Sequence, residues 1–234
     1  MDDRKARLDC FNKRICSLCG VHVNSTVSLC SACLRDLPLN EFHCSVCSLP
    51  LTDVELIRNP ICGRCIKKSP AFDQLFAPFR YDVPCDFLVT QFKYNEKLYI
   101  GPLIGALMGR KLSGKSAELL LAPVPLHEKR LASRGFNQSD IIAKSISKHL
   151  GFAYAPKLLK RVRDTPTQQS LNAKQRARNL RNAFVASHDV RERQIAVIDD
   201  VATTGATAHE LARTLKKAGA TRVEVWAFAR AARN

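Results

Sequence analysis

Residues 195–228 are typical of a strand, a helix and a second strand, and this pattern constrains the fold of the chain more than any other. The apolar run 195–198 predicts a short buried strand. Residues 208–215 carry apolar side chains at helical spacing, and Gly219 is suited to end that helix. Residues 222–228 then alternate as a second strand. Such a unit makes the two strands parallel and their crossover right-handed.

The turn between the first strand and the helix carries chemically useful groups. We expect Asp199 and Asp200 at the end of the strand, followed by Thr-Thr-Gly-Ala-Thr at 203–207. The N–H groups at a helix N-terminus bind anions such as phosphate, and Gly205 lets the backbone approach the ligand closely. The carboxylates would repel a phosphate, but they suit sugar hydroxyls or Mg²⁺. Phosphate at one end and a diol or metal at the other describe a phosphorylated ribose.

This segment resembles the motif by which type I phosphoribosyltransferases bind phosphoribosyl pyrophosphate (PRPP). That motif is a hydrophobic strand, two acidic residues and a TTG turn followed by a small residue and Thr. The resemblance implies that the two aspartates hold the ribose, that the turn wraps the 5′-phosphate and that Mg²⁺ accompanies PRPP. The PRPP-binding candidates are Asp199, Asp200, Ala202, Thr203, Thr204, Gly205, Ala206 and Thr207. The alternative is an ordinary Asp-rich strand-to-helix turn of an α/β protein.

Four Cys-x-x-Cys pairs lie between residues 16 and 65, separated by 10, 10 and 14 residues. Each pair can place two thiolates on one metal ion, and two pairs complete a tetrahedral site. Four pairs therefore predict two structural zinc sites, as in a double zinc ribbon. The expected ligands are Cys16, Cys19, Cys30 and Cys33 for one ion and Cys44, Cys47, Cys62 and Cys65 for the other.

Two other arrangements of these cysteines remain open at the level of sequence. A cross-braced pairing, first pair with third and second with fourth, uses the same residues. Disulfides are the structural alternative, although cytosolic thiols stay reduced. Two cysteines fall outside the pattern: Cys85 is expected to be a small buried apolar residue, and Cys10 has no assignable partner.

The 234-residue chain carries a formal charge of +16. Two zinc ions on eight thiolates would lower this to about +12. Residues 127–182 hold 13 Lys or Arg against 3 Asp or Glu. Such a surface attracts a nucleotide pyrophosphate or a nucleic acid, or it is simply a solvated basic face.

Hydropathy predicts no membrane span, because the chain has no apolar run of 18 residues. Its N-terminal segment is polar and lacks the apolar centre of a signal peptide, so a cytoplasmic location is expected.

The remaining chain has the pattern of strands and helices that is typical of an α/β domain. We expect a boundary near residue 68, with a Cys-rich module over 1–68 and a second domain over 69–234. Further strands are expected at 75–81, interrupted by Pro78, and at 119–124; helices are expected at 86–92, 97–112 and 138–150. Leu98, Leu103, Leu107 and Met108 are expected to face inward. Residues 160–182 are polar and basic, which favours a mobile loop or a helical hood.

Several basic residues follow strand or helix ends, where ligands of open parallel sheets bind. Arg130 and Arg134 would share a face if their segment is helical, and Arg suits pyrophosphate oxygens. The pyrophosphate- or nucleic-acid-binding candidates are Lys93, Pro125, Leu126, Arg130, Arg134, Arg163 and Arg176. His127 lies beside them, but a lone His is more often structural.

The chain as a whole resembles the ComF family. The resemblance covers the Cys-x-x-Cys pairs, Phe-Lys-Tyr at 92–94, Pro-Val-Pro at 123–125, Arg-Gly-Phe-Asn-Gln at 134–138, residues 167–179 and the motif that starts at Asp199. It implies a type I phosphoribosyltransferase-like parallel sheet flanked by helices, with a small N-terminal double zinc ribbon. It also implies a cytoplasmic role in natural competence, acting on internalised single-stranded DNA; the related GntX-type proteins are linked to use of DNA as a nutrient.

Two functions of different classes fit this sequence. In the first, PRPP binds with Mg²⁺ and the protein transfers the phosphoribosyl group through an oxocarbenium-like transition state, stabilised by positioning and charge. In the second, the protein is a non-catalytic factor for single-stranded DNA in uptake or recombination, and the PRPP pocket is a sensor. Aromatic residues are sparse near the basic stretch, where only Phe136, Phe152 and Tyr154 lie. That sparseness favours contact with the DNA backbone.

Overall fold

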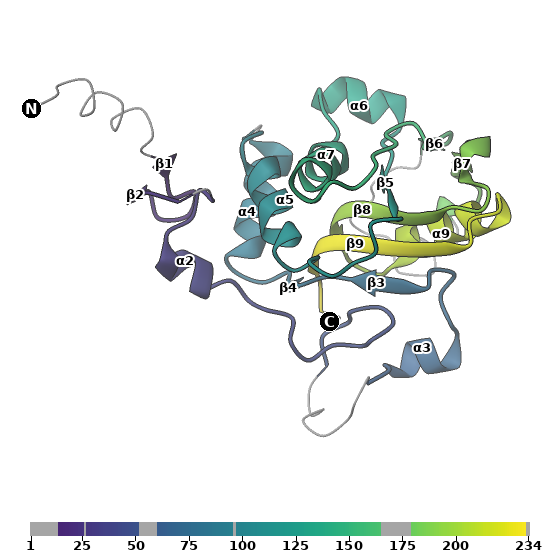
Figure 1. Cartoon of the computed structure of the whole chain (residues 1–234), viewed down its shortest axis with the longest axis horizontal. Coiled ribbons are helices and arrows are strands. Elements are labelled where there is room, and N and C mark those ends of the chain that lie inside the picture. The colour runs from purple at the N-terminus through teal and green to yellow at the C-terminus, as the bar shows by residue number, and fades with distance from the viewer. Residues whose placement is uncertain (1–13, 26, 52–59, 96, 165–178, 233–234) are drawn as a thin grey trace, which may run out of the picture.

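A computed structural model describes residues 14–25, 27–51, 60–95, 97–164 and 179–232. A parallel sheet forms its centre, with strands in the order β3-β9-β8-β5 and β4 also paired with β9 (Figure 1). The strands are β3 (Gln74–Phe76), β4 (Phe79–Arg80), β5 (Leu120–Pro123), β8 (Gln194–Ala202) and β9 (Arg222–Arg230). The β8–α9–β9 unit confirms the strand, helix and strand expected over 195–228.

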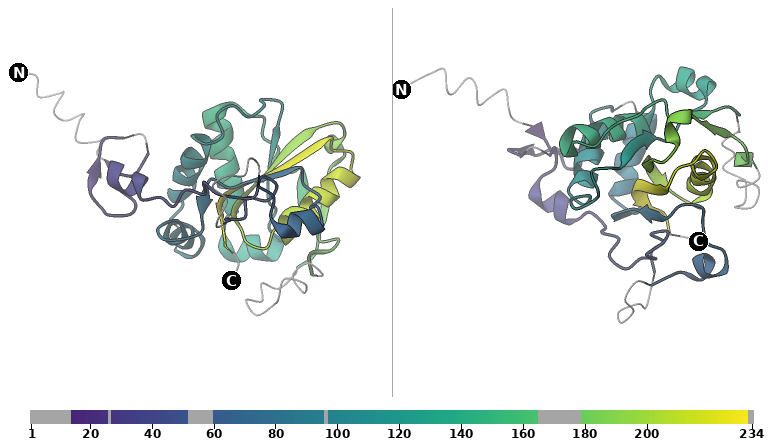
Figure 2. Two further views of the ribbon diagram at one scale, coloured as in Figure 1. Left: turned by 90° about the horizontal axis from the view of Figure 1, so that it is seen from below. Right: turned by 45° about the vertical axis from the view of Figure 1, so that its right-hand side comes forward.

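Helices cover both faces of the sheet. On one face lie α4 (Cys85–Tyr94), α5 (Ile100–Gly109) and α7 (Gln138–Leu150), and on the other lies α9 (Ala206–Lys217) (Figures 1 and 2). Alternate residues of β8 divide between two cores. Ile198 packs in the core of the first face, and Val197 packs with Leu211 of α9 in the other. Because both faces are covered, the central strands are apolar almost throughout.

Smaller elements complete the chain. The cysteine-rich segment contains β1 (Arg14–Ile15), β2 (His22–Val23), α2 (Ser31–Arg35) and α3 (Gly63–Lys67). Helix α6 (Glu128–Arg134) follows β5, and an antiparallel pair joins β6 (Leu159–Arg161) to β7 (Phe184–Ala186), with a 3-10 turn at His188–Val190. In Figures 1 and 2 the first half of the cysteine-rich segment, in purple, lies at one end of the molecule. None of the helices within the described ranges has both the length and the apolar character to cross a bilayer.

The structure corrects three details of the sequence prediction. Strand β8 includes Asp199 and Asp200, because β9 runs to Arg230 and offers backbone partners beyond Ile198. Helix α5 begins at Ile100, so Leu98 lies outside it and is 46% exposed instead of facing inward. Part of the segment 160–182 belongs to a strand rather than a loop or helical hood. Residues 165–178 of that segment lie outside the described residues.

Candidate functional site

The phosphate loop, which we define as residues 203–207, connects β8 to the first turn of α9. Gly205 has φ 75° and ψ 6°, a left-handed conformation that strains a residue with a Cβ. The Thr204 hydroxyl accepts a hydrogen bond of 3.3 Å from the N–H of Ala206. The loop lines a small cavity together with Asp199 and Val225. The N–H groups in the first turn of α9 have no helical carbonyl to bond, which makes this a suitable place for an anion.

The two adjacent aspartates have different surroundings, because successive side chains of a strand point to opposite faces. Asp199 lines the cavity of the phosphate loop. Its Oδ1 accepts hydrogen bonds from Ser139 Oγ at 3.4 Å and from the Asp200 N–H at 2.9 Å. Asp200 is 6% exposed, and its Oδ2 lies 2.8 Å from Nζ of Lys93 in α4. The strand therefore presents one carboxylate to the loop and pairs the other with a cation.

The positive charge of Lys93 compensates only part of the negative charge of Asp199 and Asp200. Burial, and then the negative charge of Asp200, raise the pKa of Asp199 to about 7. Burial by itself would lower the pKa of Lys93, but the charge and hydrogen bond of Asp200 outweigh it and raise that pKa. Two carboxylates thus share one lysine, and the charged form of Asp199 is disfavoured.

This donor set fits hydroxyl groups or a hard cation. Carboxylate oxygens are the ligands that Mg²⁺ prefers, and either Mg²⁺ or donated hydroxyl protons would compensate the charge at Asp199. A further polar group lies next to Ser139 in the sequence: Gln138 is 3% exposed, and its Nε2 has no hydrogen-bond partner in the described part of the chain. If bound here, Mg²⁺ would be held by the Asp199 carboxylate and would supply positive charge to an anionic ligand.

The basic candidates that the structure describes do not form one cluster. Lys93 lies in the site through its contact with Asp200. Arg134 lies at the end of α6 with its guanidinium carbon 6.0 Å from the centre of the Tyr94 ring, and it donates a 2.9 Å hydrogen bond to Gln138 Oε1. Since Tyr94 follows Lys93, the structure brings Arg134 close to the lysine side of the site.

The other candidates lie elsewhere or outside the described residues. Pro125 and Leu126 line a cavity of about 500 Å³ beside α6 and β6. Burial and then the charge of Arg130 lower the pKa of Arg161, which places Arg130 near β6. Arg163 donates a 2.7 Å hydrogen bond to the carbonyl of Arg181. Arg176 lies outside the described residues.

His127, which lies beside these candidates, has a structural contact. It caps α6, with Nδ1 accepting a 3.3 Å hydrogen bond from the Lys129 N–H.

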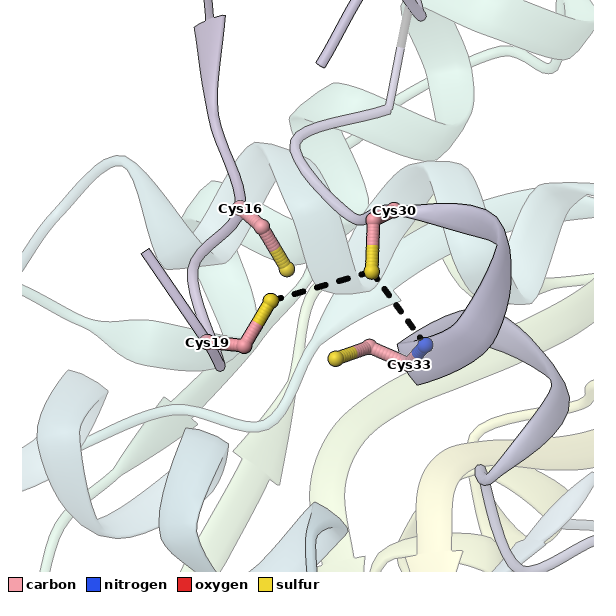
Figure 3. Close-up of side chains that lie close together, drawn as sticks. All are labelled: Cys16, Cys19, Cys30 and Cys33. Atoms are coloured by element: carbon pink, nitrogen blue, oxygen red, sulfur yellow. Dashed lines mark hydrogen bonds between the residues drawn. The ribbon is translucent and has the colours of Figure 1, made fainter. Parts of the chain in front are cut away.

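The cysteines form two groups in chain order. Within each group the Sγ atoms lie within 4.8 Å of one another. Figure 3 shows the first tetrad, Cys16, Cys19, Cys30 and Cys33, with the sulfurs pointing toward one another. The second tetrad is Cys44, Cys47, Cys62 and Cys65. The described residues therefore show the sequential arrangement and not the cross-braced one.

Both tetrads suit zinc, but their exposure differs. Four converging thiol sulfurs leave no ligand position for water, which is typical of a structural zinc site. All four cysteines of the second tetrad are buried, whereas Cys19 in the first is exposed. Burial opposes ionisation of Cys62, but hydrogen bonds from the Cys65 N–H and from neighbouring thiols outweigh it and lower its pKa to about 7.

Cys85 is buried in the core of the α4 face, as predicted, and Cys10 lies outside the described residues.

Several residues of the site were not predicted. Arg230 is 2% exposed. It donates hydrogen bonds to the carbonyl of Ala202, just before the phosphate loop, and to the carbonyl of Cys47 in the second tetrad. An arginine directly after the apolar run 225–229 is the sequence signal that could have identified it. Ser139 and Arg64 had no comparable signal, because their partners, Asp199 and Thr204, are distant in sequence.

The cysteine-rich segment matches a family model. Residues 8–69 match the double zinc ribbon domain. This range contains both tetrads, and it agrees with the double zinc ribbon expected from the cysteine spacing.

Comparison with known proteins finds relatives over most of the chain. The DNA utilization protein YhgH of Salmonella typhimurium is 34% identical over 223 residues, which cover 92% of this chain and 96% of that protein. Competence protein F of Haemophilus influenzae is 33% identical over 73% of this chain and 78% of its own length. Among solved structures, glutamine PRPP amidotransferase from B. subtilis is similar, with a TM-score of 0.41 and 18% identity over 59% of this chain and 30% of that one.

Proposed function

Since this chain belongs to the family of DNA utilization protein YhgH and competence protein F, we propose that it binds PRPP with Mg²⁺ and acts on internalised single-stranded DNA. The names of the relatives link them to DNA utilization and competence. For this chain the proposal adds a ligand and a site. Eight cysteines grouped as free thiols suit a compartment where thiols stay reduced, so we place this activity in the cytoplasm.

One observation carries the PRPP proposal: the N-terminus of helix α9 and the half-buried carboxylate of Asp199 line the same cavity. In our proposal the N–H groups of the phosphate loop bind the 5′-phosphate, Asp199 accepts hydrogen bonds from ribose hydroxyls, and Asp200 orients Lys93 toward the pyrophosphate. If an acceptor binds beside this pocket, the reaction it supports is phosphoribosyl transfer, driven by positioning and charge stabilisation.

A binding test separates this proposal from the alternative that the segment is an ordinary strand-to-helix turn with no ligand. Isothermal titration of PRPP with and without Mg²⁺ should show saturable, Mg²⁺-dependent binding that Asp199→Asn with Asp200→Asn weakens at least tenfold. Asp189→Asn removes an exposed carboxylate from the same domain and is the matched control. Wild-type affinity in the double variant would refute the ribose assignment. Pyrophosphate release with candidate acceptors, DNA included, then decides whether turnover occurs.

A second candidate function, non-catalytic binding of single-stranded DNA, is favoured by the surroundings of Tyr94. This side chain is 67% exposed and adjoins Lys93, and the Arg134 guanidinium lies over its ring. An exposed ring next to cationic side chains can stack on a base while the cations contact phosphates. In this second function the PRPP pocket would serve as a sensor.

Binding to DNA gives a separate test. We expect an oligo-dT probe to bind with an affinity that falls steeply as salt increases, because phosphate contacts release counterions. Tyr94→Ala should weaken binding, whereas Tyr99→Ala, which removes a ring that is 55% exposed in the turn before α5, is the control. Equal losses in both variants would argue against a specific stacking contact. A salt-independent affinity would argue against phosphate contacts altogether.

A further inference from the structure

We propose that the second cysteine tetrad positions the phosphate loop, so that metal binding at Cys44, Cys47, Cys62 and Cys65 and ligand binding at residues 203–207 are thermodynamically linked. This inference rests on the proposed PRPP site and adds a means of regulating it. Two arginines, Arg230 and Arg64, make the physical connection.

Arg230 is the buried half of this connection. It lies at the end of β9, and its side chain is held between the second tetrad and the start of the loop. Nε donates to the carbonyl of Cys47 at 2.9 Å, and Nη1 donates to the carbonyls of Ala202 at 2.8 Å and of Thr203. A single guanidinium therefore binds the backbone of a metal-ligand residue and the backbone that leads into the loop.

Arg64 is the exposed half. It lies in α3 between Cys62 and Cys65, and its Nη1 donates a 2.7 Å hydrogen bond to the carbonyl of Thr204. Just beyond α3, the N–H of Ala71 donates to Nδ1 of His209 in the first turn of α9 at 3.0 Å. The tetrad-bearing segment thus contacts both the loop and the helix that follows it.

These contacts determine which way the loop presents its donors. In a trans peptide the C=O of one residue and the N–H of the next point in opposite directions. The arginines hold the carbonyls of Ala202, Thr203 and Thr204 toward the tetrad. The N–H groups of residues 203–205 are consequently directed away from the tetrad, where an anion can accept them. Losing the metal would release α3 and the Cys47 backbone, and with them the anchors of the loop.

The first tetrad provides an internal comparison. Leu18, which lies between Cys16 and Cys19, borders a surface cavity together with Val83 and Phe87 at the start of α4. This contact is on the α4 side of the molecule, at the end marked in purple in Figure 1. The two tetrads should therefore have different effects on the loop.

The test compares zinc removal at the two tetrads in the full chain. Cys62→Ser with Cys65→Ser removes the second site, and Cys16→Ser with Cys19→Ser removes the first; zinc content confirms each loss. Amide hydrogen exchange of the loop is then followed for the peptide that covers residues 203–212, which includes the His209 N–H, bonded to the carbonyl of Gly205 at 2.9 Å. We expect exchange to accelerate about tenfold when the second site is lost, the effect of one charge-assisted hydrogen bond, and to change little when the first is lost.

Arg64→Ala provides a variant that keeps all eight cysteines and changes an exposed side chain. It should accelerate exchange of the loop and weaken Mg²⁺–PRPP binding about tenfold while zinc content stays unchanged. Lys67→Ala removes a cation from the same helix and should do neither. This pair decides the question if the second-tetrad variant does not fold.

Each outcome has a distinct meaning. Loop exchange that is equal in both tetrad variants, or equal in Arg64→Ala and Lys67→Ala, would overturn the linkage even if PRPP binds the wild-type chain. Failure of the wild-type chain to bind PRPP would refute the proposed function, and the exchange experiment would still test whether the tetrad holds the loop. Linkage also requires reciprocity: PRPP should raise the zinc affinity of the second tetrad by the same factor by which the metal tightens PRPP binding.

Discussion

Replacing Asp199 with Asn is expected to stabilise the protein, and to do so increasingly as pH rises. Asn keeps the Oδ1 atom that accepts hydrogen bonds from Ser139 and from the Asp200 N–H. It removes the charge that burial and the neighbouring carboxylate disfavour. A side chain that suits a ligand but destabilises the free protein is a common feature of functional sites.

The magnitude follows from the pKa of Asp199, about 7 in the folded protein against an ordinary value of 3.8. Below both values the carboxyl is protonated in the folded and unfolded states, so ionisation costs nothing. Between them the unfolded state loses its proton first, and the free energy of unfolding falls as pH rises. Each pKa unit is worth about 1.36 kcal/mol, so the cost reaches about 4 kcal/mol above pH ~7, and about 2 kcal/mol of it arises between pH ~5.5 and ~8.5.

Urea denaturation of the zinc-loaded protein at these two pH values measures the effect. The difference in unfolding free energy between Asp199→Asn and wild type should be larger at the higher pH by about 2 kcal/mol. Comparing two chains at one pH cancels the titration of the other groups, and Asp189→Asn, which removes an exposed carboxylate, is the matched control. A gain that is the same at both pH values, or a loss of stability that grows with pH, would refute the reasoning.

Three other perturbations have defined outcomes. Lys93→Met should lower the free energy of unfolding by about 3 kcal/mol, because it leaves Asp200 buried without its cation; adding Asp200→Asn should recover most of that loss in a double-mutant cycle. Gly205→Ala should cost about 1 kcal/mol from its left-handed backbone alone, since a Cβ there meets no atom within 4 Å; a much larger loss of thermal stability would mean that the loop packs more tightly than the structure shows. A chelator should remove zinc from the first tetrad, with its exposed Cys19, before the buried second tetrad; absorbance of a zinc indicator should show two phases, and Cys16→Ser with Cys19→Ser should abolish the faster one.

The local elements of this fold were readable because their signals are local. Helix α7 begins and ends where its periodicity predicted, with Asn137 as its N-cap and Gly151 at its C-terminus. The left-handed Gly205 is likewise a property of a short TTG turn between a strand and a helix. The prediction was wrong where pairing with a neighbouring strand determines how far an element extends. β8 extends through the aspartates because β9 pairs with them, which apolar content by itself does not reveal.

The candidate site was only partly predictable for the same reason. The sequence grouped Asp199 with Asp200 as equivalent ribose ligands, and this assignment stays a prediction. In the structure strand alternation gives them different neighbours: the loop cavity for one and Lys93, more than a hundred residues earlier, for the other. The basic residues that composition grouped as one surface are divided among a ring contact at Tyr94, the neighbourhood of Arg161 and the carbonyl of Arg181.

Residue order is enough to establish which chemical groups this protein possesses: a glycine turn that exposes backbone N–H groups, two adjacent carboxylates, and four cysteine pairs whose short spacing limits how they can bind metal. Short-range geometry is enough for those features, because they depend on residues a few positions apart. Tertiary structure alone decided that the cysteine pairs associate in chain order and that one tetrad lies against the phosphate loop through Arg230 and Arg64. Those contacts join residues up to 183 positions apart, and only packing of the ribbon against the sheet can bring them together.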